Sequence, residues 1–425
     1  MRLQRFLISV IILGTFGFCF GFNLNDSLAG WFIFDTTGTE YTRADGDRVY
    51  DMSHHGWEGN RNSGSYVIPT DSGYTTYRSP AIEVTPAKAG DFGNNDYTLF
   101  ARVYYRGSTG HFQKVIMKDG AVRYYKLMAE DTTGHHPGVP SFGDTAGVIY
   151  AQDTLSIGWH TLAGVRQGRM KYFYIDGVLV DSMETNIMYS TFSGNHLHFA
   201  YDSGTDYGRF MGTFSNVRIY NRALDPAEIA ELNKDVVGHW DFEEGSGDSL
   251  RDKSGYPLHG RIDGATWASG FEGNSALSFD GNDSVVIADS TSYRLRIGIK
   301  PKNKQVTLAT IVKADTLLPY ATILTTSKTT WDSGFGLAHF NGVGNTVSFF
   351  VNDTNTRATA SIVPGAWTRL VGTYDGSYLR LYVDDAIADS VSYTNPIPYK
   401  NDGLRIGSGW VGKIDDTRIY SGKQW

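Results

Sequence analysis

The sequence has little of what disulfide-bonded, nucleic-acid-binding or membrane-embedded proteins need. Among its 425 residues there is one cysteine, Cys19, which excludes a disulfide framework and a cysteine-based zinc site. The formal net charge is −7 and no lysine or arginine block offsets it, so nucleic acid and anionic membranes are poor partners. After the first 20 residues, no apolar run is long enough to span a bilayer.

The long apolar run that is present lies at the start of the sequence, in MRLQRFLISVIILGTFGFCFGF. Arg2 and Arg5 precede it, and small residues follow it. This layout is typical of a secretory signal peptide over residues 1–21, whereas a transmembrane anchor would need a longer run. We therefore predict a secreted protein, extracellular or at the cell surface, that does not insert into a membrane after cleavage.

The remaining sequence is rich in glycine and tyrosine and repeats itself once, at an offset of about 200 residues. MGTFSNVRIY (211–220) matches VGKIDDTRIY (411–420), and KYFYIDGVLVDS (171–182) matches LRLYVDDAIADS (379–390). A repeat of this length is one domain present twice. We predict domains at residues 24–233 and 234–425.

The matched segments are predicted to be strands. Leu379, Leu381 and Val383 alternate with more polar residues, and Asp176-Gly177 suits a two-residue hairpin turn. One short helix is predicted at the end of the first domain, with Asp225 as the N-cap of PAEIAEL. The expected fold class is all-β, with two consecutive β-sandwiches joined by a short helix.

The order of motifs resembles a known family. FDGNDSVVI (279–287), AWTRLVGTYDGSYLRLYVD (366–384) and GKIDDTRIY (412–420) are similar to segments of laminin-G-like, concanavalin A-like jelly-roll domains of secreted bacterial proteins. The resemblance implies two jelly rolls, in each of which the last strand pairs beside the first. It leaves function open, because this superfamily hosts lectins, adhesion modules, glycanases and polysaccharide lyases.

The resemblance also implies one calcium site, in the second domain. Related glucanase jelly rolls hold Ca²⁺ by a carboxylate in the last strand and by carbonyls near the first strand and a D-G turn. The matching positions are Asp415, the Asp241 carbonyl and Gly281. In the first domain Ser215 and Ile33 replace the two aspartates, so no site is expected there. The alternative makes Asp415 an ordinary strand-edge carboxylate.

Aromatic residues without a counterpart in the repeat are candidates for contacts with a ligand, because sugars stack on exposed rings. The candidates in domain two are Trp331 and Tyr320; those in domain one are Tyr201, Asp202 and Tyr207, in an insertion. A merely packed aromatic is the alternative for each ring.

Two other patterns are interpreted through the repeat. Trp159 and Trp367 occupy matching positions and are predicted to be core residues. His196 and His198 would share one face of a strand and could suit a metal. However, no Cys and no third His lies at a spacing that is typical of a metal site. We therefore do not predict a metal at the histidine pair.

No catalytic arrangement stands out. The E-x-D-x-x-E run of related glucanases is missing, and so are the motifs of jelly-roll lyases. We predict a non-catalytic, lectin-like protein whose partner is an extracellular or cell-surface glycan. The alternative is a structural or adhesive surface protein that binds other proteins, and a glycan-degrading enzyme of unrecognised type ranks third.

Overall fold

The computed structural model describes residues 24, 26–33, 48–50, 53, 57–61, 66–70, 73–77, 82–118, 125–132, 138–188, 190–191, 195–200, 210–234, 236–254, 258–271, 275–287, 305–326, 334–340, 344–397 and 403–421. The predicted signal peptide lies outside these residues, and so do the candidate ligand contacts Trp331, Tyr201, Asp202 and Tyr207. None of the helices in the described part is long and apolar enough to cross a membrane.

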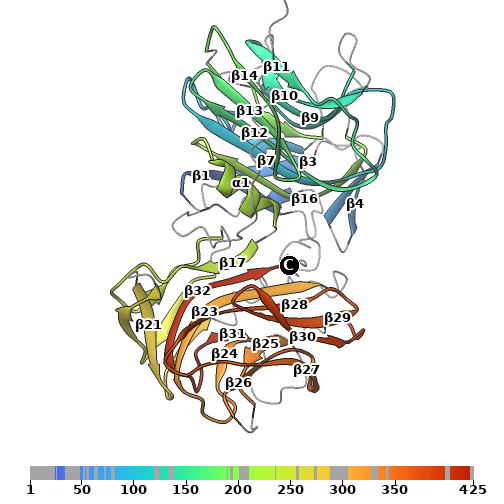
Figure 1. The fold of residues 1–425 in the computed structure, drawn as a ribbon. Helices are drawn as coiled ribbons and strands as arrows, with labels where there is room; N and C mark the ends of the chain where they lie inside the picture. Colours follow the sequence, from blue (N-terminus) through green and yellow to red (C-terminus); the bar gives the residue numbers. More distant parts are fainter. Residues whose placement is uncertain are drawn as a thin grey trace, which may run out of the picture.

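The first repeat forms two antiparallel sheets, each with eight strands among the described residues (Figure 1). Sheet A has the order β14 (Val178–Glu184), β13 (Met170–Ile175), β12 (Gly158–Gln167), β7 (Tyr97–Tyr105), β16 (Gly212–Tyr220), β5 (Gly73–Tyr77) and β4 (Tyr66–Thr70), with β1 (Leu28–Ile33) also paired to β16. Sheet B has the order β11 (Gly147–Tyr150), β10 (Val139–Asp144), β9 (Tyr125–Asp131), β8 (Gln113–Lys118), β15 (Leu197–Phe199), β6 (Ile82–Thr85), β3 (Glu58–Arg61) and β2 (Arg48–Tyr50).

The second repeat has the same arrangement, strand for strand, over its described residues. Sheet C has the order β30 (Ala386–Ser392), β29 (Tyr378–Val383), β28 (Trp367–Tyr374), β23 (Val306–Thr316), β32 (Val411–Tyr420), β21 (Ser275–Asp280) and β20 (Thr266–Ser269), with β17 (Val236–Trp240) also paired to β32. Sheet D has the order β27 (Asp353–Ser361), β26 (Thr346–Val351), β25 (Phe335–Ala338), β24 (Thr322–Thr325), β31 (Leu404–Ile406), β22 (Ser284–Ile287), β19 (Gly260–Asp263) and β18 (Ser249–Leu250). The predicted all-β fold of two sandwiches is confirmed.

The last strand of each repeat lies beside the first strand of the same repeat, as the resemblance implied. In the first copy Trp31 of β1 faces Arg218 of β16, and in the second His239 of β17 faces Arg418 of β32. These four residues occupy equivalent positions, so differences between the copies can be compared residue by residue.

The two predicted hairpin turns have the same backbone although only one contains glycine. Asp176 and Gly177 have φ angles of 51° and 76°, and Asp384 and Asp385 have 47° and 67°. A left-handed conformation costs energy in a residue other than glycine. In both copies the first turn residue accepts a backbone N–H, Asp176 from Thr161 at 2.8 Å and Asp384 from Arg369 at 2.9 Å, which favours aspartate at that position.

Helix α1 (Pro226–Asn233) begins with the predicted capping box. The Asp225 carboxylate accepts the Glu228 N–H at 2.9 Å, and the Glu228 carboxylate accepts the Asp225 N–H at 2.9 Å. Both carboxylate oxygens of Glu228 also bind the Arg222 guanidinium, at 2.6 and 2.7 Å. The ion pair fixes the helix start to the end of β16, two residues before Arg222.

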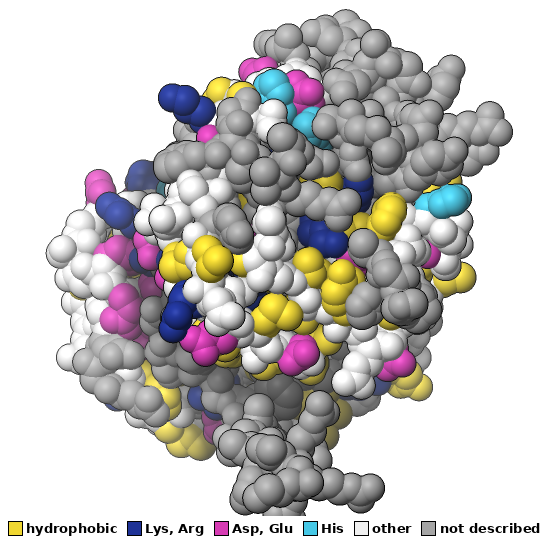
Figure 2. All heavy atoms as spheres, turned by 90° about the horizontal axis from the view of Figure 1, so that it is seen from above, with side chains coloured by type: hydrophobic (Ala, Val, Ile, Leu, Met, Phe, Trp, Pro, Cys, Tyr) yellow, Lys and Arg dark blue, Asp and Glu magenta, His cyan; other side chains and the backbone are white. Residues whose placement is uncertain are grey.

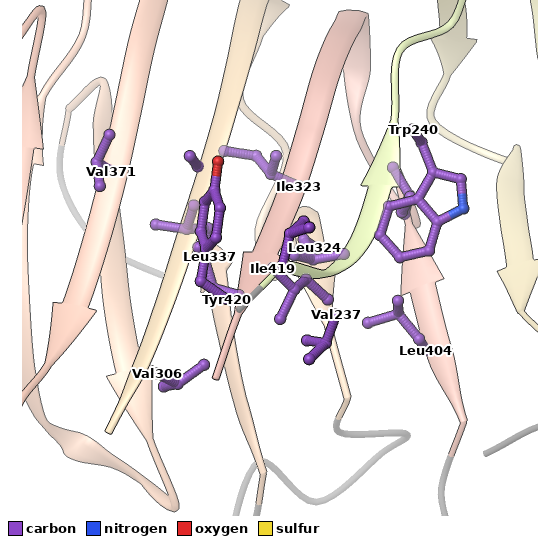
Figure 3. Close-up of a cluster of buried hydrophobic side chains, with 14 of the residues drawn as sticks. Val237, Trp240, Val306, Ile323, Leu324, Leu337, Val371, Leu404, Ile419 and Tyr420 are labelled. Carbon is purple, nitrogen blue, oxygen red and sulfur yellow. The ribbon is translucent and has the colours of Figure 1, made fainter. Parts of the chain in front are cut away.

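The core of each domain lies between its two sheets, since alternate side chains of every long strand point inward. Along β7, Leu99 and Ala101 belong to the core of domain one, whereas Phe100 between them points to the other side of sheet A. In domain two the core includes Trp240, Ile323 and Leu337 (Figure 3). Trp159 and Trp367 were predicted to be core residues and are not: both are half-buried, because each lies at an end of its strand.

Candidate ligand-binding site

The predicted calcium ligand Asp415 is a buried carboxylate in the middle of β32. One of its oxygens accepts the Phe271 N–H at 2.9 Å, and the other accepts the Asp416 N–H at 2.7 Å. Asp241 follows Trp240 of β17, which faces Thr417 of β32, so Asp241 lies beside this part of the strand. The structure therefore brings two of the three predicted calcium positions together.

The two adjacent aspartates of β32 have opposite electrostatic environments. Burial, together with the nearby Asp416 and Glu243 carboxylates, raises the pKa of Asp415 to about 7, although the backbone N–H groups of Phe271 and Asp416 act to lower it. Burial would also raise the pKa of Asp416, but Arg418 and His239 hold it below its usual value. Asp416 is thus paired with the Arg418 guanidinium inside the protein, whereas Asp415 faces other acids.

Gly281, the third predicted calcium position, lies elsewhere. It follows Asp280, which pairs with Val411 at the start of β32, four residues from Asp415. Gly281 is one residue further from Asp415 than Asp280 is, and five residues at the rise of a β-strand place it roughly 16 Å from Asp415 along the sheet. The structure does not bring these two predicted positions together, because the strand register sets where the D-G turn falls.

A cation held by Asp415 and Asp241 would need further oxygen ligands. Burial raises the pKa of Glu243, and the charges of Asp241, Glu244 and Asp416 add to that effect. Among the described residues, no group of three or more His, Cys, Asp or Glu side chains is arranged to hold a metal. Carbonyl oxygens would therefore have to supply most ligands, which suits Ca²⁺ better than a transition metal.

Tyr320, the described candidate for ligand stacking in domain two, is 52% exposed. It lies between β23 and β24, with a φ angle of 62°, beside the partly exposed Leu318. A side chain at Gly281 would approach Leu318 to 3.0 Å, so the D-G turn and the Tyr320 loop meet at one corner of the sandwich. Tyr320 is thus accessible to a ligand there.

The structure also reveals a polar face that the sequence did not predict, on the side of sheet B that points away from sheet A. Each strand of this sheet alternates between core residues and residues on the outer side. Pairing brings His198 of β15 between Glu83 of β6 and Met117 of β8, and Met117 faces Lys126 of β9. We call the set Glu83, His196, His198, Lys126, Asp131 and Ser141 the sheet B face.

One end of the sheet B face is a buried network of charge and hydrogen bonds. Asp131 pairs with the Lys126 ammonium and accepts a hydrogen bond from the Ser141 hydroxyl at 2.7 Å. The Lys126 ammonium also lies 5.8 Å from the centre of the Tyr150 ring. This network fixes the side-chain directions on β9 and β10, and it gives the Asp131 carboxylate both a cation and a hydrogen-bond donor.

The other end is more open and contains the histidine pair. Nδ1 of His196 lies 3.3 Å from one Glu83 carboxylate oxygen, and Nε2 of His198 lies 3.6 Å from the other. The side chains of His196 and Glu83 are 36% and 29% exposed, and that of His198 is 6% exposed. The imidazole rings can donate and accept hydrogen bonds, and the Glu83 carboxylate accepts them. Figure 2, a view from the domain-one end, shows hydrophobic side chains near the middle of the described surface, with acidic, basic and histidine side chains around and between them.

The equivalent outer side of sheet D has a different chemistry. Arg405 occupies the position of His198, and its neighbour Val286 occupies that of Glu83. Phe350 packs edge-on against Phe340 at 5.5 Å, and the Arg357 guanidinium lies 4.7 Å from the centre of the Phe340 ring. We call Arg405, Arg357, Phe340 and Phe350 the sheet D face.

The family of the chain follows from a comparison with family models. The model described as "Concanavalin A-like lectin/glucanases superfamily" matches residues 78–230 and again residues 279–423, which is more than half of the chain and one match in each repeat. The chain belongs to this superfamily. A comparison with curated proteins found no match.

Solved structures similar to this superfamily member are distant. Domain 4 of the GH43 extracellular arabinanase AbnA from Geobacillus stearothermophilus, solved with arabinotriose, is 16% identical, with a TM-score of 0.35; the match covers 44% of this chain and 93% of that one. Domains LG4-5 of the mouse laminin alpha1 chain are 14% identical, with a TM-score of 0.27 and coverage of 79% and 84%. The binding domain of Paraclostridial Mosquitocidal Protein 1 is 12% identical, with a TM-score of 0.39 and coverage of 94% and 92%. The family assignment rests on the family model alone.

The sequence did not predict the sheet B face of this superfamily member, because the residues of the face are far apart in the chain. The available signal was the alternation of IEVT (82–85), in which Glu83 and Thr85 leave the core face, and of LHF (197–199). Each run is too short to reveal its partner, so the juxtaposition of Glu83, His198 and Lys126 appears only with the strand order.

Proposed function

We propose that the protein is a non-catalytic, lectin-like binder of extracellular or cell-surface glycan. The observation that carries the proposal is the open end of the sheet B face, where the Glu83 and His196 side chains are accessible on a rigid sheet in a member of a lectin/glucanase superfamily. Sugar hydroxyls both donate and accept hydrogen bonds, and carboxylate, imidazole and hydroxyl groups match them. Strands hold such groups with less positional spread than loops do.

Support for a non-catalytic role comes from how the acids of this face are engaged. Glycoside hydrolysis needs two carboxyl groups that flank one bond, one as acid and one as nucleophile or base. Asp131 is paired with Lys126 and bonded to Ser141, and Glu83 lies between His196 and His198. We propose that Glu83, which is partly exposed, orients ligands without reacting, and that the buried Asp131 only supports the face.

We further propose that the protein is exported, in keeping with its signal-peptide-like start, and that domain two carries one Ca²⁺. The fit of the cation to the structure is partial. Asp415 and Asp241 lie together with Glu243 nearby, and Gly281 does not contribute. In this form the ion would neutralise Asp415 and tie β32 to the end of β17.

The test is binding to immobilised mucin, yeast mannan and plant arabinan, which differ in charge and branching. The double variant Glu83→Ala/His196→Ala should lose about 5- to 30-fold in affinity for a polymer that wild type binds through this face, the equivalent of one or two hydrogen bonds. Arg169→Ala is the matched control, since Arg169 pairs with Glu184 on sheet A and is exposed.

Unchanged affinity in the double variant would exclude the sheet B face as the site. If wild type binds none of the three polymers and no glycan on an array, the protein-binding alternative replaces the proposal.

A further inference from the structure

The two domains meet through their equivalent sheets. Phe100, Val165 and Tyr220 point out of sheet A on the side opposite the core of domain one, and they belong to one buried apolar cluster that continues into domain two. Ile229 and Leu232 of α1 belong to the same cluster. Helix α1 therefore covers the outer side of sheet A.

The opposite side of α1 contacts sheet C. The Glu231 carboxylate accepts a hydrogen bond from the Tyr420 hydroxyl at 2.8 Å and lies 3.4 Å from the Arg418 guanidinium, and all three side chains are buried. Arg418 and Tyr420 are on β32, the strand that also holds Asp415. The layers thus follow in the order sheet B, sheet A, α1, sheet C, sheet D (Figure 1).

Direct contacts between the domains hold this order in place. The Arg218 guanidinium of β16 donates to the Ser254 carbonyl of domain two at 2.6 Å, and the Leu24 N–H donates to the Lys253 carbonyl at 3.0 Å. On the helix, the Thr161 hydroxyl of sheet A donates to the Asn233 side chain at 2.7 Å. A joint with a shared apolar cluster and buried polar contacts on both sides is not a flexible linker.

This order directs the sheet B face and the sheet D face away from each other. Sheets pack about 10 Å apart and a helix occupies a layer of similar thickness, so the two outer sheets are separated by roughly 40 Å. A short oligosaccharide cannot reach from one face to the other around the body of the protein.

We propose that one molecule bridges two separate glycan-bearing bodies, one at each outer face. This inference rests on the proposed function and adds the arrangement of its sites. Two linked sites strengthen binding to a single partner only if both can be engaged at once, and opposed faces on a rigid joint prevent that on one flat surface. The same geometry holds one face free whenever the other is occupied.

The two faces also select different partners. The sheet B face presents carboxylate and imidazole groups, whereas the sheet D face presents two guanidinium groups: Arg405 on β31, and Arg357 on β27 over the buried Phe340 ring. Arginine recognises carboxylates, which sugar acids carry, and neutral polyhydroxyl groups suit the sheet B face. The two bridged bodies therefore differ in charge: one presents neutral glycan and the other presents acidic glycan.

The experiment mixes two kinds of bead, coated with yeast mannan as neutral glycan and with mucin as acidic glycan, and measures mixed aggregates by two-colour microscopy. Three proteins are compared with wild type: Glu83→Ala/His196→Ala for the sheet B face, Arg405→Ala/Arg357→Ala for the sheet D face, and Arg169→Ala as the control. Binding of each protein to each single bead type is measured in parallel, and circular dichroism checks that the variants are folded.

We expect wild type and the control to form mixed aggregates, and each face variant to lose them about tenfold or more while it still binds one bead type. Binding of wild type to both bead types without mixed aggregates would refute the bridging geometry and leave the proposed function standing. A face variant that aggregates the beads as wild type does would also refute it. Absence of binding to either bead type would count against the proposed function itself.

Discussion

Glu231 of α1 provides the sharpest test of how firmly the two domains are joined. Its side chain is 3% exposed and meets three groups: the Tyr420 hydroxyl at 2.8 Å, Lys234 at 3.3 Å and Arg418 at 3.4 Å. Arg418 keeps its contacts with Asp416, at 2.8 and 3.0 Å, when Glu231 is replaced. The perturbation therefore removes one partner of a network without leaving the arginine wholly unpaired.

Two substitutions separate charge from hydrogen bonding. Glu231→Gln keeps an acceptor for the Tyr420 hydroxyl and removes the charge next to Arg418, which should cost about 1–2 kcal/mol. Glu231→Leu also leaves that buried hydroxyl without its acceptor, which should cost about 2–4 kcal/mol in all. The Lys234 contact adds little, because the Lys234 side chain is 31% exposed.

Urea unfolding of the full chain, followed by tryptophan fluorescence, measures these costs. Glu184→Gln is the control, since its pair with Arg169 is exposed and should be worth less than about 0.5 kcal/mol. Because Glu231 joins the domains, the Leu variant should also separate one unfolding transition into two. If both variants unfold within about 0.5 kcal/mol of wild type, the Glu231 network does not stabilise the joint, which then depends on the shared apolar cluster and the other contacts between the domains.

Three other predictions concern single sites. Chelator should lower the melting temperature of the full chain, and Asp415→Ala should abolish that response; a wild type indifferent to chelator would exclude the Ca²⁺. The Asp176 carboxylate, 2.7 Å from His160, raises the pKa of His160 above 6.5, so this pair stabilises the fold below that pH and the benefit disappears as pH rises through the raised pKa. His160→Thr should thus be destabilised more at about pH 6 than at about pH 8.5 in thermal melts, and an equal difference at both would contradict the pairing. Gly164→Ala and Gly372→Ala place a methyl group within 2.1 and 2.3 Å of a core phenylalanine ring, so each should cost about 1–3 kcal/mol in urea unfolding; a neutral result would show that the ring can shift.

Much of the fold could be predicted from the sequence, because segments that match between the two repeats predict the same strands in both domains. The match of residues 171–182 with residues 379–390 identifies the same hairpin twice, and the capping box at Asp225 identifies α1. These are local features, in which the residues that determine the structure are neighbours in the sequence. The error at Trp159 and Trp367 is local too, because matching positions establish equivalence and say nothing of burial.

The candidate site was harder to predict because it depends on strand register. Asp415 and Asp241 come together because the first and last strands of the domain pair, whereas Gly281 follows the end of β21, beyond the pair of Asp280 with Val411 at the far end of β32. The sheet B face requires β6, β15, β8 and β9 to be neighbours in that order, although β15 is distant in sequence from the other three. One residue of slip in any of these pairings would move its side chains from the outer side to the core.

The meeting of sheets A and C through their outer sides has a consequence for symmetry. When two copies of a domain join by equivalent surfaces, the contact closes on itself, in the way of a two-fold dimer and not of a head-to-tail filament. Arg218 and Arg418 occupy equivalent positions at this contact, where Arg218 binds the Ser254 carbonyl and Arg418 binds Glu231 of α1. Helix α1 therefore makes the two halves of the contact different, while both sheets still take part in it. A third copy of the domain could not add by the same contact, because both surfaces are already used. Any chain with further copies would have to attach them through an edge strand or an outer face.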